Sequence, residues 1–104
     1  MTKSRLPSAA LITPRATRDL AEIAEYLRTH NPSAALAVRD AILRSLQNLA
    51  LFPGIGRPQN VEGVRKLVTP RYRYLIYYTI DKGAEEVVIL TIQHPARRRE
   101  YRNI

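Results

Sequence analysis

The chain has 104 residues, enough for one domain with a modest core, and its formal charge of +8 points to an acidic partner. It contains no cysteine and two histidines, which excludes a disulfide scaffold or thiolate metal site and disfavours a protein-only metal site. No apolar run approaches the roughly 20 residues that cross a bilayer, and the first residues lack the apolar core of a signal peptide. We therefore expect a cytoplasmic protein without cofactor, metal or membrane contact.

The first predicted element is a short apolar strand over residues 8–12. It stops at Thr13-Pro14, where a hydroxyl can cap a helix and proline can occupy the first turn. A helix is expected to follow, because apolar residues recur at helical spacing while Asp19 and the other charged residues stay largely in water. The apolar positions of this helix are Leu20, Ile23, Ala24 and Leu27.

A second helix is predicted after Asn31-Pro32, which repeats the pattern of a capping residue followed by proline. It is expected to run to about Leu51 and to end at Phe52-Pro53-Gly54. A short link around Thr29 and His30 makes the two helices an antiparallel hairpin. The inner stripe of the second helix consists of Ala35, Val38, Ile42, Leu46 and Leu49.

The second half changes to the spacing of strands after a loop over 53–63 that is rich in glycine and proline. Strands are predicted over 65–69, 72–80 and 85–93, with a tight turn at 81–84. In the longest of them, Tyr74, Ile76 and Tyr78 share one face, and Leu75 and Tyr77 share the other. Val88, Leu90 and Ile92 share the parity of His94 unless a bulge intervenes.

This order predicts an α+β domain, β-α-α-β-β-β, with the helical hairpin packed on a small, mainly antiparallel sheet. We expect one domain over residues 1–104, with a basic tail from about residue 96. Four strands and one helical layer leave one sheet face without a cover. A partner is expected on that face.

Basic residues are concentrated in the second half of the chain. Residues 1–56 carry seven basic and four acidic groups, whereas residues 57–104 carry ten and five. These clusters suit phosphate or an acidic protein segment, and the alternative is an ordinary solvated surface. The strongest clusters are Arg57, Arg65, Lys66, Arg71 and Arg73, and then Arg97, Arg98, Arg99 and Arg102.

The segment after the last predicted strand holds the residues best suited to chemistry. His94 can accept or donate a proton near neutral pH, Arg97 and Arg73 stay cationic, and Tyr101 can stack on a base or position a phosphate. Together they could cleave RNA. The alternative for His94-Pro95 is structural, because proline cannot continue a strand ladder and leaves its neighbour extended.

The ordered set of motifs resembles the RelE/ParE superfamily of toxins from type II toxin–antitoxin pairs. The resemblance covers most of the chain, and the loop and the long hairpin are more similar to the ParE branch. It is carried by Leu11-Ile-Thr-Pro-Arg-Ala16, Asp19-Leu-Ala-Glu-Ile-Ala-Glu-Tyr26, Asn31-Pro-Ser-Ala-Ala35, Leu51-Phe-Pro-Gly-Ile-Gly-Arg-Pro58, Arg73-Tyr-Leu-Ile-Tyr-Tyr78 and Val88-Ile-Leu through His94-Pro-Ala-Arg97.

The resemblance implies a bacterial growth inhibitor that a cognate antitoxin neutralises in a hetero-oligomer. ParE-like members are associated with inhibition of DNA gyrase, whereas RelE-like members cut messenger RNA in the ribosomal A site. We expect a gyrase inhibitor that binds without catalysis. The first alternative is a ribosome-dependent endoribonuclease that uses His94, Arg97, Tyr101 and Arg73, and the second is a non-toxic basic nucleic-acid-binding module.

The surface predicted to bind partners combines cations with apolar side chains of the sheet. It suits an antitoxin with an acidic amphipathic C-terminal segment, which charge would attract and apolar contacts would hold. Arg57 has an alternative role, in which a salt bridge with a helix acid fixes its loop. The residues assigned to this surface are Arg57, Arg65, Lys66, Arg71, Arg73, Leu75, Tyr77, Arg97 and Arg98.

Overall fold

A computed structural model describes residues 4–5 and 10–96 of the chain. Its helices are α1 (Pro14–His30), α2 (Pro32–Leu51) and the short 3-10 helix η1 (Pro53–Ile55). Its strands are β1 (Ser4–Arg5), β2 (Ala10–Ile12), β3 (Arg57–Pro58), β4 (Val64–Val68), β5 (Leu75–Asp81) and β6 (Glu86–Gln93).

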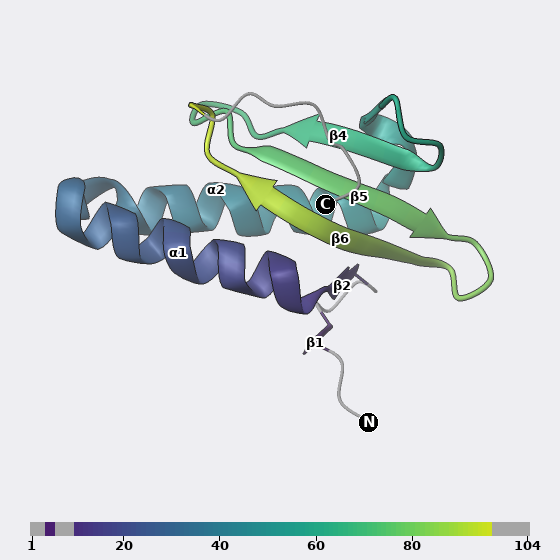
Figure 1. Cartoon of the computed structure of the whole chain (residues 1–104), viewed down its shortest axis with the longest axis horizontal. Coiled ribbons are helices and arrows are strands. Elements are labelled where there is room, and N and C mark those ends of the chain that lie inside the picture. The colour runs from purple at the N-terminus through teal and green to yellow at the C-terminus, as the bar shows by residue number, and fades with distance from the viewer. Residues whose placement is uncertain (1–3, 6–9, 97–104) are drawn as a thin grey trace.

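The strands of the described residues form one sheet in the order β1-β2-β6-β5-β4-β3. The β2–β6 pair is parallel, and the other pairs are antiparallel. In Figure 1, α2 passes behind the strands and α1 runs along the side of β6, so neither helix lies on the front face of the sheet. The predicted α+β fold is confirmed. The sheet gains β1 and β3, which are two residues each and too short to show a period in the sequence.

The start of α1 is tied to the sheet by Thr13. Its hydroxyl accepts a hydrogen bond from the Ala16 N–H (3.1 Å) and donates one to the Ile89 carbonyl of β6 (2.8 Å). The predicted cap therefore satisfies a free N–H of the helix and joins the helix to β6 with the same oxygen.

The helical hairpin turns more sharply than its sequence predicts. The link was expected around Thr29 and His30, but both are helical, and only Asn31 separates α1 from α2. The Asn31 side chain caps no backbone N–H of α2; its Oδ1 accepts from the Ser33 hydroxyl instead (3.0 Å). Pro32, which cannot continue α1, begins the new helix with its fixed φ.

The main core lies between the two helices and the sheet. The predicted stripes face it: Leu27 is buried on α1, and Val38, Ile42, Leu46 and Leu49 are each at most 2% exposed on α2. Burying one such side chain contributes about 1.5–3 kcal/mol. The sheet supplies Tyr74, Ile76, Tyr78, Val87, Ile89 and Ile92 to the same core.

The strand predicted from Tyr72 begins three residues later, at Leu75. Arg71 and Arg73 have φ angles of 73° and 62°, which end the extended conformation between β4 and β5. Thr69 closes this turn, because its carbonyl accepts from the Arg73 N–H (3.0 Å) and its hydroxyl from the Tyr74 N–H (2.9 Å). The alternating aromatic pattern includes Tyr72 and Tyr74, so it predicted a strand over residues that belong to this glycine-free turn.

A bulge interrupts β6 at Leu90. Tyr77 of β5 pairs with Thr91 and Tyr78 pairs with Ile89, so Leu90 has no partner. Ile89 and Ile92 consequently both face the main core, and Leu90 packs on the opposite side of the sheet. The shared face of Val88, Leu90 and Ile92 was predicted only for a strand without a bulge, and the bulge at Leu90 is the exception that the prediction named.

Asp19 of α1 holds the strand beyond the bulge. Its Oδ2 accepts from the Thr91 hydroxyl (2.5 Å) and from the Ile92 N–H (3.0 Å). β2 pairs with β6 only as far as Ile89, so the Asp19 carboxylate accepts the hydrogen bond of a β6 residue that lies beyond the end of β2. The expectation that Asp19 stays largely in water is wrong: it is half-buried.

No helix in the part of the chain that the structure covers is long and apolar enough to cross a membrane.

Candidate functional site

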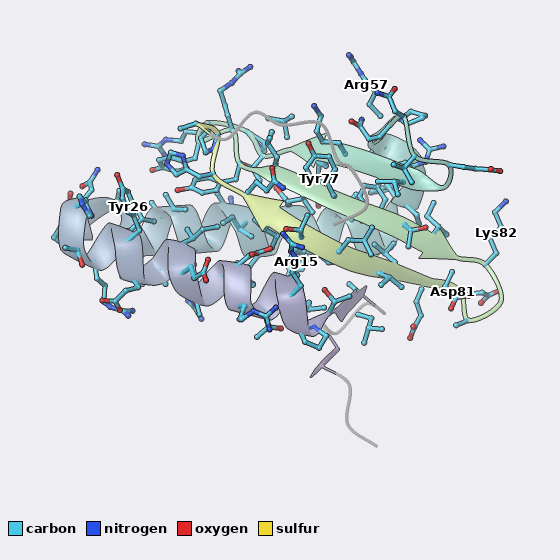
Figure 2. The ribbon with its side chains drawn as sticks, in the orientation of Figure 1. Arg15, Tyr26, Arg57, Tyr77, Asp81 and Lys82 are labelled. Carbon is cyan, nitrogen blue, oxygen red and sulfur yellow. The ribbon has the colours of Figure 1, made fainter. Side chains whose placement is uncertain are left out.

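His94 lies at the end of β6 against aromatic rings from two other elements. Its ring meets Tyr74 edge to face, with 5.3 Å between centroids, and Tyr26 of α1 with 6.0 Å. Tyr26 in turn stacks on His30, with 4.1 Å between centroids. Figure 2 shows Tyr26 on the helical hairpin, at the end where β6 finishes. Because Tyr74 is buried and Tyr26 is half exposed, His94 closes the edge of the core.

One ring nitrogen of His94 is occupied. The Ala96 N–H donates to His94 Nδ1 (3.0 Å), so the neutral ring carries its proton on Nε2. This bond turns the chain back immediately after Pro95. Nδ1 therefore already accepts a hydrogen bond from the backbone, whereas the Nε2–H group can still donate a hydrogen bond.

Arg71 and Arg73 are displayed by the turn between β4 and β5. Both are exposed, and the Arg71 guanidinium lies 5.3 Å from the centre of the Tyr72 ring. Left-handed backbone at two non-glycine residues costs on the order of 1 kcal/mol each, and such residues tend to cluster at functional sites. Leu75 pairs with Gln93, so this turn and His94 lie at the same end of the sheet.

The predicted catalytic set is thus only partly described. Arg73 and His94 share one end of the sheet, whereas Arg97 and Tyr101 lie outside the described residues, as does Arg98 of the predicted partner-binding surface. Within residues 10–96, no three His, Cys, Asp or Glu side chains come together as a metal site.

The sheet face opposite the helices carries a second, smaller apolar cluster. Leu75 and Tyr77 are buried there beside Val64. Lys66 pairs with Tyr77 and also with Arg57, so these cations belong to the same face of the sheet. Part of the predicted partner-binding surface is therefore grouped on this face.

Arg65 has a different position from the other predicted partner-binding cations. It pairs with Tyr78 and so belongs to the helix side of the sheet. Its Nη1 donates to the carbonyls of Gly56 (2.7 Å) and Gly54 (3.3 Å). The guanidinium is already used to hold the loop after α2.

Tyr78 fixes the same loop from the side of the main core. Its hydroxyl donates to the Pro53 carbonyl (2.6 Å) and accepts from the Gly56 N–H (2.8 Å), while its ring lies in the main core. The salt bridge expected for Arg57 is not found among the described residues; Arg57 is exposed and points away from the molecule in Figure 2. Arg65 and Tyr78 hold the loop in its place, and no sequence pattern distinguished them from neighbouring cations and tyrosines.

The buried tyrosines predict a loss of stability in alkali. Burial raises the pKa of Tyr78 above 10.0, although the Gly56 N–H and Arg65 oppose this, and burial together with Tyr26 raises the pKa of Tyr74. Because the unfolded chain releases these protons first, their contribution is complete below about pH 10 and falls as the pH rises through the folded pKa. Urea unfolding from pH 8 to 11 should show this fall, with a shallower slope in Tyr78→Phe. An unchanged slope would contradict the assignment.

Comparison with known proteins gives consistent matches. The family described as the ParE toxin of the type II toxin–antitoxin system parDE matches residues 10–99. Y4kP of Sinorhizobium fredii, which is named as a toxin, is 38% identical over 82 residues, covering 79% of this chain and 82% of that protein. Toxin RelE3 of Caulobacter vibrioides is 34% identical over 88 residues, covering 83% and 92%.

Two solved structures share the fold. A chain of the chromosomal ParDE system from P. aeruginosa superposes with a TM-score of 0.67 at 29% identity, covering 80% of this chain and 90% of that one. A chain of the RelBE2 toxin–antitoxin complex from Mycobacterium tuberculosis gives 0.55 at 27% identity, covering 86% and 99%. With a family match over residues 10–99 and relatives that are themselves named toxins, the chain belongs to the ParE toxin family of type II toxin–antitoxin systems.

Proposed function

We propose that this toxin arrests growth by binding DNA gyrase, without catalysis of its own, and that a cognate antitoxin silences it. The match to the ParE family over residues 10–99 supports the gyrase target, because the loop and hairpin that suggested this branch lie within the matched region. The ParDE system of P. aeruginosa, whose chain shares the fold, supports the antitoxin partner.

The environment of His94 is the observation that carries the non-catalytic part of the proposal. Its ring packs against Tyr74 and Tyr26, and its Nδ1 accepts from the Ala96 N–H. A general base must offer a free lone pair to the substrate hydroxyl. His94 uses that lone pair to close the end of β6, which favours a structural role.

The antitoxin is expected to be an acidic amphipathic segment. Lys66 lies on the sheet face opposite the helices, and Arg71 and Arg73 extend the positive charge to the end of that sheet. Between Asp40 and Asp81 the sequence contains one acid, Glu62, against six basic residues. Such a field attracts an acidic chain and raises its association rate.

The endoribonuclease remains the second candidate. It is supported by the position of Arg73 and His94 at one end of the sheet and by the similarity to a chain of the RelBE2 complex and to toxin RelE3. A non-toxic nucleic-acid-binding module would draw only on the charge of +8.

An assay of the purified toxin and an assay in cells distinguish these activities. We expect the purified toxin to inhibit gyrase supercoiling, and brief induction in cells to arrest growth while transcript ends stay unchanged. Coexpression of the cognate antitoxin should restore growth. Absence of growth arrest would favour the non-toxic module.

The variant His94→Phe tests whether His94 acts in catalysis or only in packing. Phenylalanine keeps the edge-to-face contacts with Tyr74 and Tyr26 but removes both ring nitrogens. The gyrase proposal predicts that this variant inhibits supercoiling within about twofold of the parent, since packing is conserved. Transcript cleavage by the parent that disappears in His94→Phe would instead establish the nuclease.

A further inference from the structure

Three large apolar side chains at the end of α2 stand mostly in solvent. Leu51, Phe52 and Ile55 are 62%, 60% and 51% exposed. The Ile55 N–H donates to the Phe52 carbonyl (3.2 Å), so the single turn of η1 brings the backbone of Ile55 close to that of Phe52, which directly follows Leu51. Isolated exposed apolar residues are ordinary, but a group of them marks a contact surface. We call these three residues the apolar tip.

The apolar tip is held rigidly. Two side chains fix the backbone between Phe52 and Ile55 and directly after Ile55: Tyr78 bonds to Pro53 and Gly56, and Arg65 bonds to the carbonyls of Gly54 and Gly56. The Phe52 N–H also donates to the Asn48 carbonyl of α2 (2.8 Å). A segment whose backbone is already ordered pays little loop-ordering entropy when it binds, which favours affinity for a preformed partner.

The charge around the apolar tip is positive. Residues 41–61 contain two basic residues, Arg44 and Arg57, and no acid. Both are exposed, and Figure 2 shows Arg57 extending away from the fold at this end of the sheet. The complementary surface is therefore an apolar pocket with an acidic rim.

We propose that the apolar tip, with Arg57 beside it, is the surface by which this toxin docks on a folded target protein. The inference rests on the proposed function, in which that target is gyrase. A short rigid tip fits a preformed pocket. An extended acidic antitoxin segment suits the longer cationic surface formed by Lys66, Arg71 and Arg73.

Removal of the apolar tip tests this surface. The double variant Leu51→Ser, Phe52→Ser should raise the concentration needed for half inhibition of supercoiling by at least about tenfold, as expected for central apolar contacts. Leu36→Ser is the matched control, because Leu36 is 69% exposed on the same helix, about 22 Å along its axis from Leu51. It should stay within about twofold of the parent. Thermal unfolding verifies that both variants remain folded.

A charge reversal at Arg57 tests the electrostatic part of the docking surface separately. Arg57→Glu should weaken inhibition by about tenfold at low salt and by less at high salt, because screening reduces the interaction. Lys82→Glu makes the same change in net charge in the turn between β5 and β6, away from Arg57 in Figure 2, and should have little effect. Equal effects of the two reversals would overturn the role of Arg57.

Failure of the inference can be distinguished from failure of the proposed function. If the parent inhibits gyrase and the double variant inhibits it equally, the docking surface is wrong and the function stands. If the double variant keeps inhibition but is no longer neutralised by the cognate antitoxin, the apolar tip binds the antitoxin and the inference fails. If the parent arrests growth without affecting gyrase, the function is wrong; loss of arrest in the double variant then supports docking on another protein, and retained arrest overturns it.

Discussion

Gly56→Ala is expected to destabilise the toxin by about 2–4 kcal/mol, because the added methyl group would overlap the Tyr78 side chain, which is buried and held by hydrogen bonds. An added Cβ would lie 2.4 Å from the Tyr78 hydroxyl and 2.6 Å from its ring. Tyr78 is fully buried, and its hydroxyl bonds to both Pro53 and Gly56. Relief of the contact therefore breaks those bonds or shifts the ring within the core. Urea unfolding at neutral pH measures the loss.

Gly54→Ala provides the matched control two residues earlier in the same loop. Nothing lies within 4 Å of a Cβ added at Gly54, and its backbone is not left-handed. This variant should change the free energy of unfolding by less than about 0.5 kcal/mol, or stabilise slightly by restricting the unfolded chain. Similar losses in both variants would show that the loop, rather than the contact with Tyr78, governs the effect.

The same contact connects stability with the proposed docking surface. Gly56, Tyr78 and Arg65 fix the backbone on which Leu51, Phe52 and Ile55 are displayed. The close approach of Gly56 to Tyr78 requires glycine at this position for a reason of space. The glycine- and proline-rich motif therefore encodes a rigid loop rather than a flexible connection.

Most of the fold follows from local patterns. The helical stripes, the caps with proline and the alternation of Tyr74, Ile76 and Tyr78 against Leu75 and Tyr77 each depend on residues close in sequence. These patterns predicted both helices, the three long strands and the division of β5 between two faces. They also identified Thr13 as a helix cap.

The remaining features depend on contacts between distant residues. Nothing in its own sequence marks the bulge at Leu90. Pro70 marks the turn after β4, but no glycine indicates that the backbone becomes left-handed at Arg71 and Arg73. Arg65 resembles Arg57 in sequence, and only the register of β4 with β5 decides that Arg65 turns toward the loop. The candidate site was predicted by residue type, but its geometry required the pairing of the strands.

Asp19→Ala is expected to cost about 2–3 kcal/mol, although Asp19 was predicted to be a solvated helix residue. The change leaves the Thr91 hydroxyl, which is 1% exposed, and the Ile92 N–H without their carboxylate acceptor. Amide exchange at Ile92 should accelerate together with the loss of global stability, because this N–H lies where β2 no longer covers β6. Urea unfolding and hydrogen exchange provide the two measurements.

Two further variants decide whether the acceptor oxygen is the cause. Asp19→Asn keeps an oxygen for Thr91 and Ile92 and should recover most of the stability, whereas Glu22→Ala, at an exposed position of the same helix, should be nearly neutral. If Asp19→Asn is as unstable as Asp19→Ala, the carboxylate charge rather than hydrogen bonding holds the strand. Asp19 and Thr13 both join α1 to β6 around the bulge, and His94 follows Ile92 by two residues. Loss of the Asp19 bonds should therefore also disturb the packing of His94 on Tyr26. The carboxylate of Asp19 on α1 thus helps to position His94, a candidate functional residue, at the end of β6.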